Sequence, residues 1–270
     1  MTIPHLKESM KKVTDKDYTD EYFRLQVRRY KELDEWARTR IKNVLSTVKP
    51  SKRDIIADIG CGIGTFAIEC AKRGSYVYAV DYSQVALDIA KGLRKEMGVD
   101  RITFINSSVD DIPIEDCKVN KAICADLVEH LYPKEFDALL KELHRIVKKD
   151  GYVYIYTPNP KNLVGLLPDP IKRLGMSIFI RSKLDNMNDE KTKEVEEYNQ
   201  KFEYVHVDLK DAKYIKSKLI ERNFKIEREI HKIMWLPALE EIPVVRNYMG
   251  NHILIIARKI SSIVDAKRLG

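Results

Sequence analysis

Short apolar runs alternate with longer amphipathic segments through most of this chain of 270 residues. Short runs bounded by Gly, Pro or Asp are typical of buried strands, and the amphipathic segments between them are typical of helices. The predicted strands cover residues 55–59, 76–80, 102–105, 119–125, 152–157, 224–233 and 252–260. The predicted helices cover residues 21–48, 85–97, 134–147 and 209–222, and a further helix begins at Thr65. Regular alternation of this kind predicts an α/β fold, in which helices cover both faces of a mostly parallel sheet.

The ends of the chain and one internal segment depart from this alternation of strands and helices. Residues 1–18 are polar and rich in lysine, so residues 1–50 read as an arm followed by a helix, ahead of a main domain at 51–260. Residues 161–205 read as an insertion into that domain, and residues 261–270 as a tail. Within the insertion, residues 163–181 mix apolar and basic side chains, which predicts either a hydrophobic lid or peripheral contact with a membrane.

The most informative stretch is the turn that follows the first predicted strand. Gly60, Cys61, Gly62 and Gly64 lie between that strand and the helix that begins at Thr65. Glycines allow a sharp turn and close approach of a ligand to the backbone, and the free N–H groups of the next helix then face the ligand. This arrangement predicts a nucleotide-binding turn.

Two carboxylates accompany the turn. Asp81 ends the second strand, where an acidic side chain can accept both hydroxyl groups of a ribose, and Tyr82 follows it. Asp58 precedes the turn by two residues and would suit a cationic ligand. A dinucleotide oxidoreductase shares the strand, turn and acid, but the Gly-x-Gly-x-Gly spacing and the C-terminal strand pair favour another ligand.

In these motifs the sequence resembles the class I S-adenosylmethionine-dependent methyltransferases, over about residues 50–260. The resemblance implies a Rossmann-like sheet of seven strands, mostly parallel and closed by an antiparallel strand, with S-adenosylmethionine as cofactor. It also implies that Ser108 and Val109 meet the adenine, although relatives commonly have Asp at the position of Ser108. The residues expected to bind the cofactor are Asp58, Gly60, Cys61, Gly62, Gly64, Asp81, Tyr82, Ser108, Val109 and Ala125.

A second cluster follows the fourth strand, at the sheet edge where ligands bind. Asp126, Glu129 and His130 resemble the Glu-x-x-Glu-His pattern of the ubiquinone-biosynthesis O-methyltransferases and the small-RNA 2′-O-methyltransferases, and His206 lies downstream. The resemblance implies a divalent metal held by these four residues, and carboxylates with imidazoles suit such an ion. The alternatives are a metal-free general base, His130 or His206, and a merely structural role in packing.

Composition and charge bear on the binding partners and the cellular compartment of the protein. A net charge of +7 and a pI near 9.0 indicate an RNA partner, an anionic membrane surface or simply a solvated exterior rich in Lys and Glu. The four cysteines have no metal-ligand spacing, which predicts a reduced, cytoplasmic protein. We also expect no signal peptide and no membrane-spanning run.

Together these features predict transfer of a methyl group from S-adenosylmethionine to a small or lipophilic acceptor, at an oxygen atom. One alternative is an RNA methyltransferase with a metal-assisted 2′-O reaction. It lacks support from an appended RNA-binding module or from interleaved aromatic and basic residues. Another alternative is a non-catalytic subunit with a methyltransferase fold. The intact glycine turn and Asp81 argue against it, because a scaffold needs neither. The sequence predicts no oligomeric state.

Overall fold

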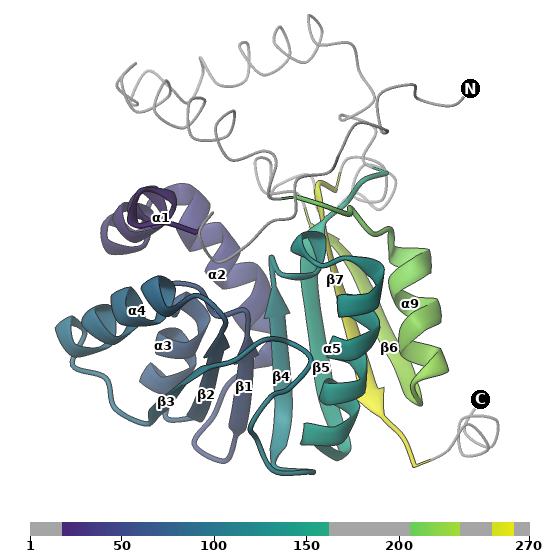
Figure 1. Ribbon diagram of the computed structural model, residues 1–270. Coiled ribbons are helices and arrows are strands. Elements are labelled where there is room, and N and C mark those ends of the chain that lie inside the picture. The colour runs from purple at the N-terminus through teal and green to yellow at the C-terminus, as the bar shows by residue number, and fades with distance from the viewer. Residues whose placement is uncertain (1–17, 162–205, 233–249, 262–270) are drawn as a thin grey trace, which may run out of the picture.

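A computed structural model describes residues 18–161, 206–232 and 250–261. In this part of the chain seven strands form one sheet, in the order β3-β2-β1-β4-β5-β7-β6 (Figure 1). Neighbouring strands are parallel except around β7, which runs antiparallel to both β5 and β6. The strands are β1 (Ile55–Ile59), β2 (Tyr76–Asp81), β3 (Ile102–Asn106), β4 (Val119–Ala125), β5 (Val147–Pro158), β6 (Phe224–Lys232) and β7 (His252–Lys259). The parallel strands therefore end at one common edge of the sheet.

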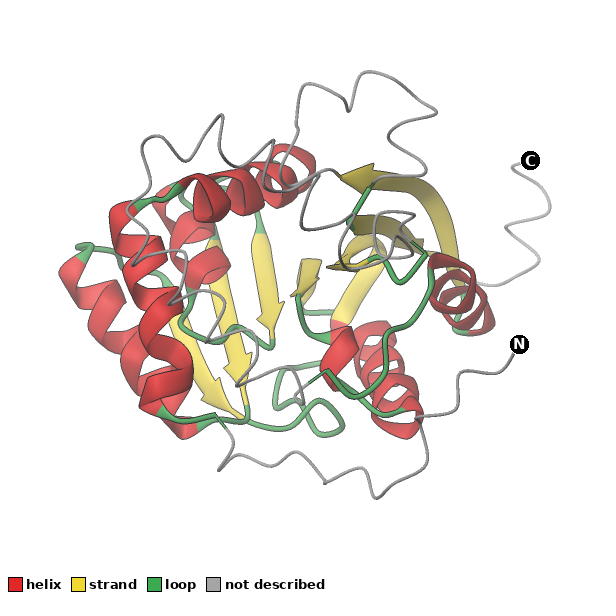
Figure 2. Ribbon diagram, turned by 90° about the horizontal axis from the view of Figure 1, so that it is seen from above, coloured by secondary structure: helices red, strands yellow, loops and turns green. Residues whose placement is uncertain are grey.

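Helices cover both faces of this sheet, as the views in Figure 1 and Figure 2 show. The helices α2, α3 and α4 contribute buried side chains to one face, and α5 and α9 contribute them to the other. The α-helices are α1 (Asp20–Glu32), α2 (Glu35–Val48), α3 (Thr65–Lys72), α4 (Gln84–Glu96), α5 (Pro133–Ile146) and α9 (Ala212–Glu221); a 3-10 turn covers Val128–His130. The predicted α/β architecture, with its antiparallel closing strand, is confirmed.

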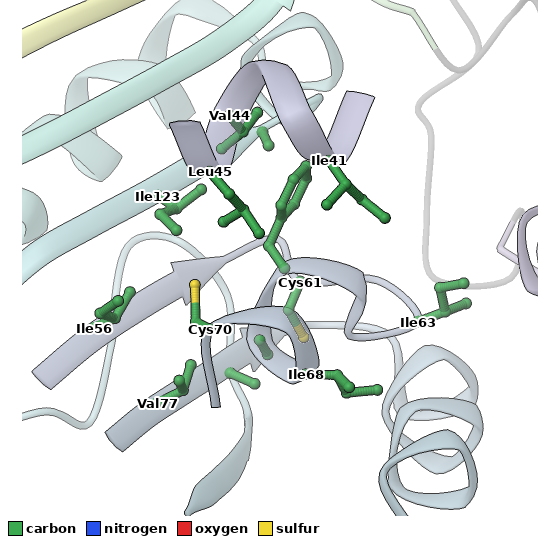
Figure 3. Packing of buried hydrophobic residues seen from close by; sticks show 14 of the residues in the cluster. Ile41, Val44, Leu45, Ile56, Cys61, Ile63, Ile68, Cys70, Val77 and Ile123 are labelled. Atoms are coloured by element: carbon green, nitrogen blue, oxygen red, sulfur yellow. The ribbon is translucent and has the colours of Figure 1, made fainter. Parts of the chain in front are cut away.

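Each face of the sheet packs into its own apolar core. On the first face, Leu45 of α2 and Cys70 of α3 meet Ile56 and Val77 of the central strands, and all four are buried (Figure 3). Burial of this kind contributes about 25 cal/mol for each Å² of apolar surface removed from water. The two cores hold the sheet rigidly, so the loops at its carboxyl edge have fixed starting points.

The predicted helix over residues 21–48 is wrong in one respect, because the structure divides it into α1 and α2. Leu33 adopts a left-handed conformation with φ of 46°, which ends α1. The Asp34 carboxylate then accepts a hydrogen bond of 2.7 Å from the Ala37 N–H and caps α2. This bend places α1 beside the carboxyl edge of the sheet (Figure 1). Thr19 caps α1, because its side-chain oxygen accepts a hydrogen bond from the Tyr22 N–H.

The predicted arm also needs a correction at its last residue. Tyr18 was expected to belong to a mobile polar segment, but its side chain is buried in the first core. Residues 1–17 lie outside the described part of the chain, as do most of the predicted insertion, including residues 163–181, and most of the tail. The division into arm, domain, insertion and tail therefore stays a prediction. In the described segments, no helix combines the length and the apolar character that crossing a membrane requires.

Candidate functional site

The glycine turn after β1 is hydrogen-bonded to the end of β2. The N–H groups of Gly60 and Cys61 both donate to the carbonyl oxygen of Val80, over 2.8 and 3.0 Å. Gly60 has φ of 68°, and a Cβ atom on it would lie 2.7 Å from Leu127 Cδ1, so the position needs glycine for two reasons. Gly62 has φ of 51°, and a Cβ atom there would meet nothing within 4 Å. The turn is thus tight at Gly60 and open at Gly62.

Asp81 is joined to this turn by its side chain. One carboxylate oxygen accepts from the Gly62 N–H over 2.8 Å, and the other accepts from the Ser83 N–H over 2.9 Å. Burial raises the pKa of the Asp81 carboxyl, and its bonds to backbone N–H groups oppose that rise. The carboxylate is therefore fixed in position beside the turn, as a ribose ligand would require.

A cavity of about 520 Å³ lies at this edge of the sheet. A volume of this size is in the range of small-molecule sites. Eight of the ten residues expected to bind the cofactor line it: Gly60, Cys61, Gly62, Asp81, Tyr82, Ser108, Val109 and Ala125. The sequence did not predict the lining residues that α1 and α2 contribute, among them Tyr22, Leu25 and Trp36. The bend between α1 and α2 brings them there.

The other two expected cofactor ligands, Asp58 and Gly64, lie outside the cavity lining. Asp58 is 1% exposed, and its carboxylate accepts from the Ala67 N–H in the first turn of α3. Burial raises the pKa of Asp58 to about 7. Gly64 begins α3, and a Cβ atom there would lie 3.1 Å from Ala90 Cβ. Both residues therefore lie next to the turn without lining the cavity, and direct contact with a cofactor stays a prediction for them.

The predicted metal-binding residues come together in part. Ligand atoms of Glu129, His130 and His206 all lie within 4.8 Å of one another, and these residues line the same cavity. Glu129 is buried and accepts a hydrogen bond of 2.9 Å from the Thr157 hydroxyl. Burial, reinforced by the nearby Asp126 carboxylate, raises the pKa of Glu129 to about 8. The His130 and His206 rings are 4.9 Å apart.

Asp126 corrects the expected set of four. It is not among the residues whose ligand atoms cluster, because its carboxylate instead accepts a hydrogen bond from Arg40 Nε of α2. The Arg40 guanidinium lies over the Phe66 ring, 4.6 Å from its centre. Asp126 itself has φ of 52°, so the chain turns sharply as it leaves β4. One oxygen of the Asp126 carboxylate is thus bonded to α2, and the carboxylate is not part of the cluster.

Lys210 joins the two segments that carry the cluster, the turn with Glu129 and His130 and the segment with His206. Its ammonium donates to the carbonyl oxygens of Val128 and Leu131, over 2.9 and 2.6 Å, and forms an ion pair of 3.0 Å with Asp208. The side chain is 1% exposed, and burial lowers the pKa of Lys210. The N–H groups of Val207 and Asp208 also donate to the Glu129 carbonyl. These bonds hold His206 against the turn that carries Glu129 and His130.

Four residues of the site were not predicted from the sequence: Tyr18, Arg40, Lys210 and His252. The Tyr18 hydroxyl lies 3.3 Å from His130 Nδ1, and the Tyr18 ring meets the Tyr82 ring edge to face at 5.5 Å. His252, at the start of β7, lines the cavity beside Asp126. Each of the four comes from an element far along the chain from its partner, so spacing alone gives no signal.

Part of this chain matches known proteins. A family described as "Methyltransferase domain" matches residues 56–151. The ubiquinone biosynthesis O-methyltransferase of Vibrio vulnificus is 29% identical over 105 residues, which are 38% of this chain and 43% of that protein. The carboxy-S-adenosyl-L-methionine synthase of Nautilia profundicola is 31% identical over 149 residues, 52% of this chain and 60% of that one. The chain thus spans about half the length of these two curated relatives.

The fold has a counterpart among solved structures. A S-adenosylmethionine-dependent methyltransferase from Aquifex aeolicus superposes with a TM-score of 0.56 at 16% identity, over 86% of this chain and 97% of that one. At this identity the likeness shows the fold. Taken with the domain matched at residues 56–151 and the curated relatives, it supports the class I S-adenosylmethionine-dependent methyltransferase superfamily for this chain.

Proposed function

We propose that this protein transfers the methyl group of S-adenosylmethionine to an oxygen atom of a small or lipophilic acceptor. One observation carries the proposal: a single cavity is lined on one side by the glycine turn and Asp81, and on another by Glu129, His130 and His206. The proposed cofactor site and a set of proton-accepting groups therefore share one cavity. Two curated relatives, an O-methyltransferase and a carboxy-S-adenosylmethionine synthase, support the cofactor.

The residues present suit the cofactor. The open space at Gly62 lets a ligand lie against the backbone, and the Asp81 carboxylate is held where ribose hydroxyls could donate to it. Ser108 and Val109 line the position expected for the adenine. When bound, S-adenosylmethionine supplies an electrophilic methyl group and its own leaving group. The protein then has to orient the acceptor, exclude water and remove a proton from the acceptor hydroxyl.

A screen for methyl acceptors tests this proposal. The protein is incubated with S-adenosylmethionine carrying a labelled methyl group and with phenols, quinone precursors or RNA, and the methylated product is located by mass spectrometry. We expect label on the oxygen of a small phenolic or lipophilic compound. Label on carbon or nitrogen of every accepted compound would contradict oxygen as the target atom.

A second function, metal-assisted 2′-O methylation of RNA, is favoured by one specific observation. Glu129, His130 and His206 offer one carboxylate and two imidazoles within 4.8 Å, a ligand set that suits a divalent ion which activates a hydroxyl. Binding of Mn²⁺, followed by paramagnetic resonance in wild type and in His206→Ala, tests the site. RNA affinity that falls steeply with salt would favour this function over the first.

The third reading, a non-catalytic subunit, makes the opposite prediction. Such a protein would have no use for the cavity beside Asp81 and would fail to bind S-adenosylmethionine. Contact with a membrane stays a hypothesis because residues 163–181 lie outside the described chain, and the cytoplasmic location stays a prediction from the cysteine pattern.

A further inference from the structure

A third histidine, His252, lies in the wall of the cavity with its ring fixed in place. It begins β7 and pairs in register with Pro158, at the end of β5. Its ring stacks on the Tyr156 ring with centres 4.9 Å apart and planes 10° apart. The sheet register and the stacking together hold the imidazole at the carboxyl edge, where the cavity lies.

A fixed carboxylate faces one side of this ring. His252 Nε2 lies 3.9 Å from one carboxylate oxygen of Asp126, whose other oxygen accepts from Arg40. The Asp126 backbone is tied down as well, because its N–H donates to the Tyr156 carbonyl over 2.8 Å. Arg40, Asp126 and His252 thus form a chain from α2, across the end of β4, to β7.

The other ring nitrogen lacks a partner. Among the described residues, nothing bonds to His252 Nδ1, although the atom is buried. Buried polar atoms in proteins are nearly always paired, so an unpaired nitrogen on a residue that lines the cavity is a candidate for contact with a bound molecule. Burial lowers the pKa of His252, and the positive charge of Arg40 and the nearby His206 lower it further, while Asp126 raises it. In its neutral form an imidazole has a lone pair on one ring nitrogen, which can accept a proton.

We propose that His252 is the general base that removes the proton from the acceptor hydroxyl, with Asp126 as the residue that orients its ring. The proposal rests on the proposed oxygen methylation. The acceptor O–H bond breaks, its proton goes to the imidazole, and its electron pair stays on the oxygen, which becomes the nucleophile. The resulting imidazolium is stabilised by the Asp126 carboxylate. No other reactant is needed for this step.

The geometry favours His252 over the two histidines that the sequence indicated. His130 and His206 lie ring against ring in the cluster with Glu129, and His130 Nδ1 is within 3.3 Å of the Tyr18 hydroxyl. These contacts suit residues that hold a ligand or an ion. His252 instead combines an unpaired nitrogen, Nδ1, with a carboxylate oxygen 3.9 Å from its other ring nitrogen, so that the carboxylate can stabilise a positive charge on the ring.

His252→Gln tests the proposal, and His231→Gln is a matched control. His231 lies on the neighbouring strand β6 with Nε2 2.9 Å from Glu229, and its Nδ1 is also buried and unpaired, but it does not line the cavity. The probe is catechol, a simple phenol. Binding of S-adenosylhomocysteine, binding of catechol to that complex, and methylation of catechol are measured for each protein between pH 5.5 and 9.

We expect His252→Gln to bind S-adenosylhomocysteine within twofold of wild type and to methylate catechol at least 100-fold more slowly, the usual range for loss of a general base. The fall of wild-type turnover at low pH should be absent from the variant. In nuclear magnetic resonance titrations, Asp126→Asn should lower the pKa of the His252 ring. His231→Gln should match wild type in every measurement.

Three results would overturn the proposal. The first is turnover of His252→Gln within threefold of wild type, and the second is an equal loss of S-adenosylhomocysteine affinity and of turnover in that variant. The third is a wild-type protein that binds S-adenosylhomocysteine but neither binds nor methylates catechol. Wild type that fails to bind S-adenosylhomocysteine would instead refute the proposed function itself. The two failures are thus distinguishable.

Discussion

Substitution of the turn glycines separates backbone strain from steric contact. Gly60→Ala places a methyl group 2.7 Å from Leu127 Cδ1 and requires a left-handed φ of 68° from an alanine. The left-handed conformation costs about 1–2 kcal/mol, and the forced contact adds about 1–3 kcal/mol. Gly62→Ala carries the same backbone strain at φ of 51° without any contact. Gly60→Ala should therefore destabilise the protein by about 2–5 kcal/mol, and Gly62→Ala by about 1–2 kcal/mol.

Urea denaturation, followed by circular dichroism, measures both free energies of unfolding. Gly92→Ala is the matched control, because Gly92 lies inside α4 with ordinary backbone angles and open space around its Cα. It should stabilise the protein by about 0.5–1 kcal/mol, since alanine favours a helix. Replacing Leu127 by alanine should make Gly60→Ala less damaging than it is alone, because the clash is with that side chain. Equal losses in Gly60→Ala and Gly62→Ala, whether or not Leu127 is present, would refute this reasoning.

Three further predictions follow from particular contacts. Lys210→Met should lower the affinity for Mn²⁺ and the turnover rate by a larger free energy than it lowers the free energy of unfolding. Lys121→Met is the control, because it removes a lysine paired with Asp54 over 2.8 Å at the other end of the sheet. It should lower the free energy of unfolding without changing turnover. Equal loss of turnover in the two variants would contradict a positioning role for Lys210. Tyr18→Phe should raise the KM of the acceptor more than fivefold through loss of the contact with His130, with cofactor affinity unchanged by calorimetry. Because the folded-state pKa of Glu129 is raised to about 8, the folded protein holds this proton more tightly than the unfolded chain. Its contribution to stability therefore falls as pH rises from about 4.5 to 8, and Glu129→Gln should flatten that slope in urea titrations.

Local patterns predicted most of the sheet and the part of the cavity lining that the glycine turn and Asp81 form. The turn at Gly60 and Gly62 and the carboxylate of Asp81 each stand directly after a buried strand, so the parallel topology places them at one edge. The bend at Leu33 escaped prediction because the apolar spacing continues through it, and the Asp34 cap was the local signal.

The rest of the site depends on tertiary packing that spacing does not encode. His252 reaches Asp126 through the antiparallel register of β5 and β7, in which it faces Pro158. Arg40 reaches the same carboxylate because α2 packs over the first face of the sheet. Lys210 is buried against the ordinary preference of lysine, because carbonyl oxygens and a carboxylate surround its ammonium. Such placements emerge from the whole fold.

Binding of S-adenosylmethionine, measured by titration calorimetry, tests the central claim most directly. Wild type is compared with Asp81→Ala, which removes the carboxylate beside Gly62, and with Asp88→Ala, which removes an exposed carboxylate of α4. We predict binding by wild type and by Asp88→Ala, and a loss of at least tenfold in Asp81→Ala. Absence of binding in wild type, or equal affinity in all three proteins, would contradict the assignment of this cavity to the cofactor.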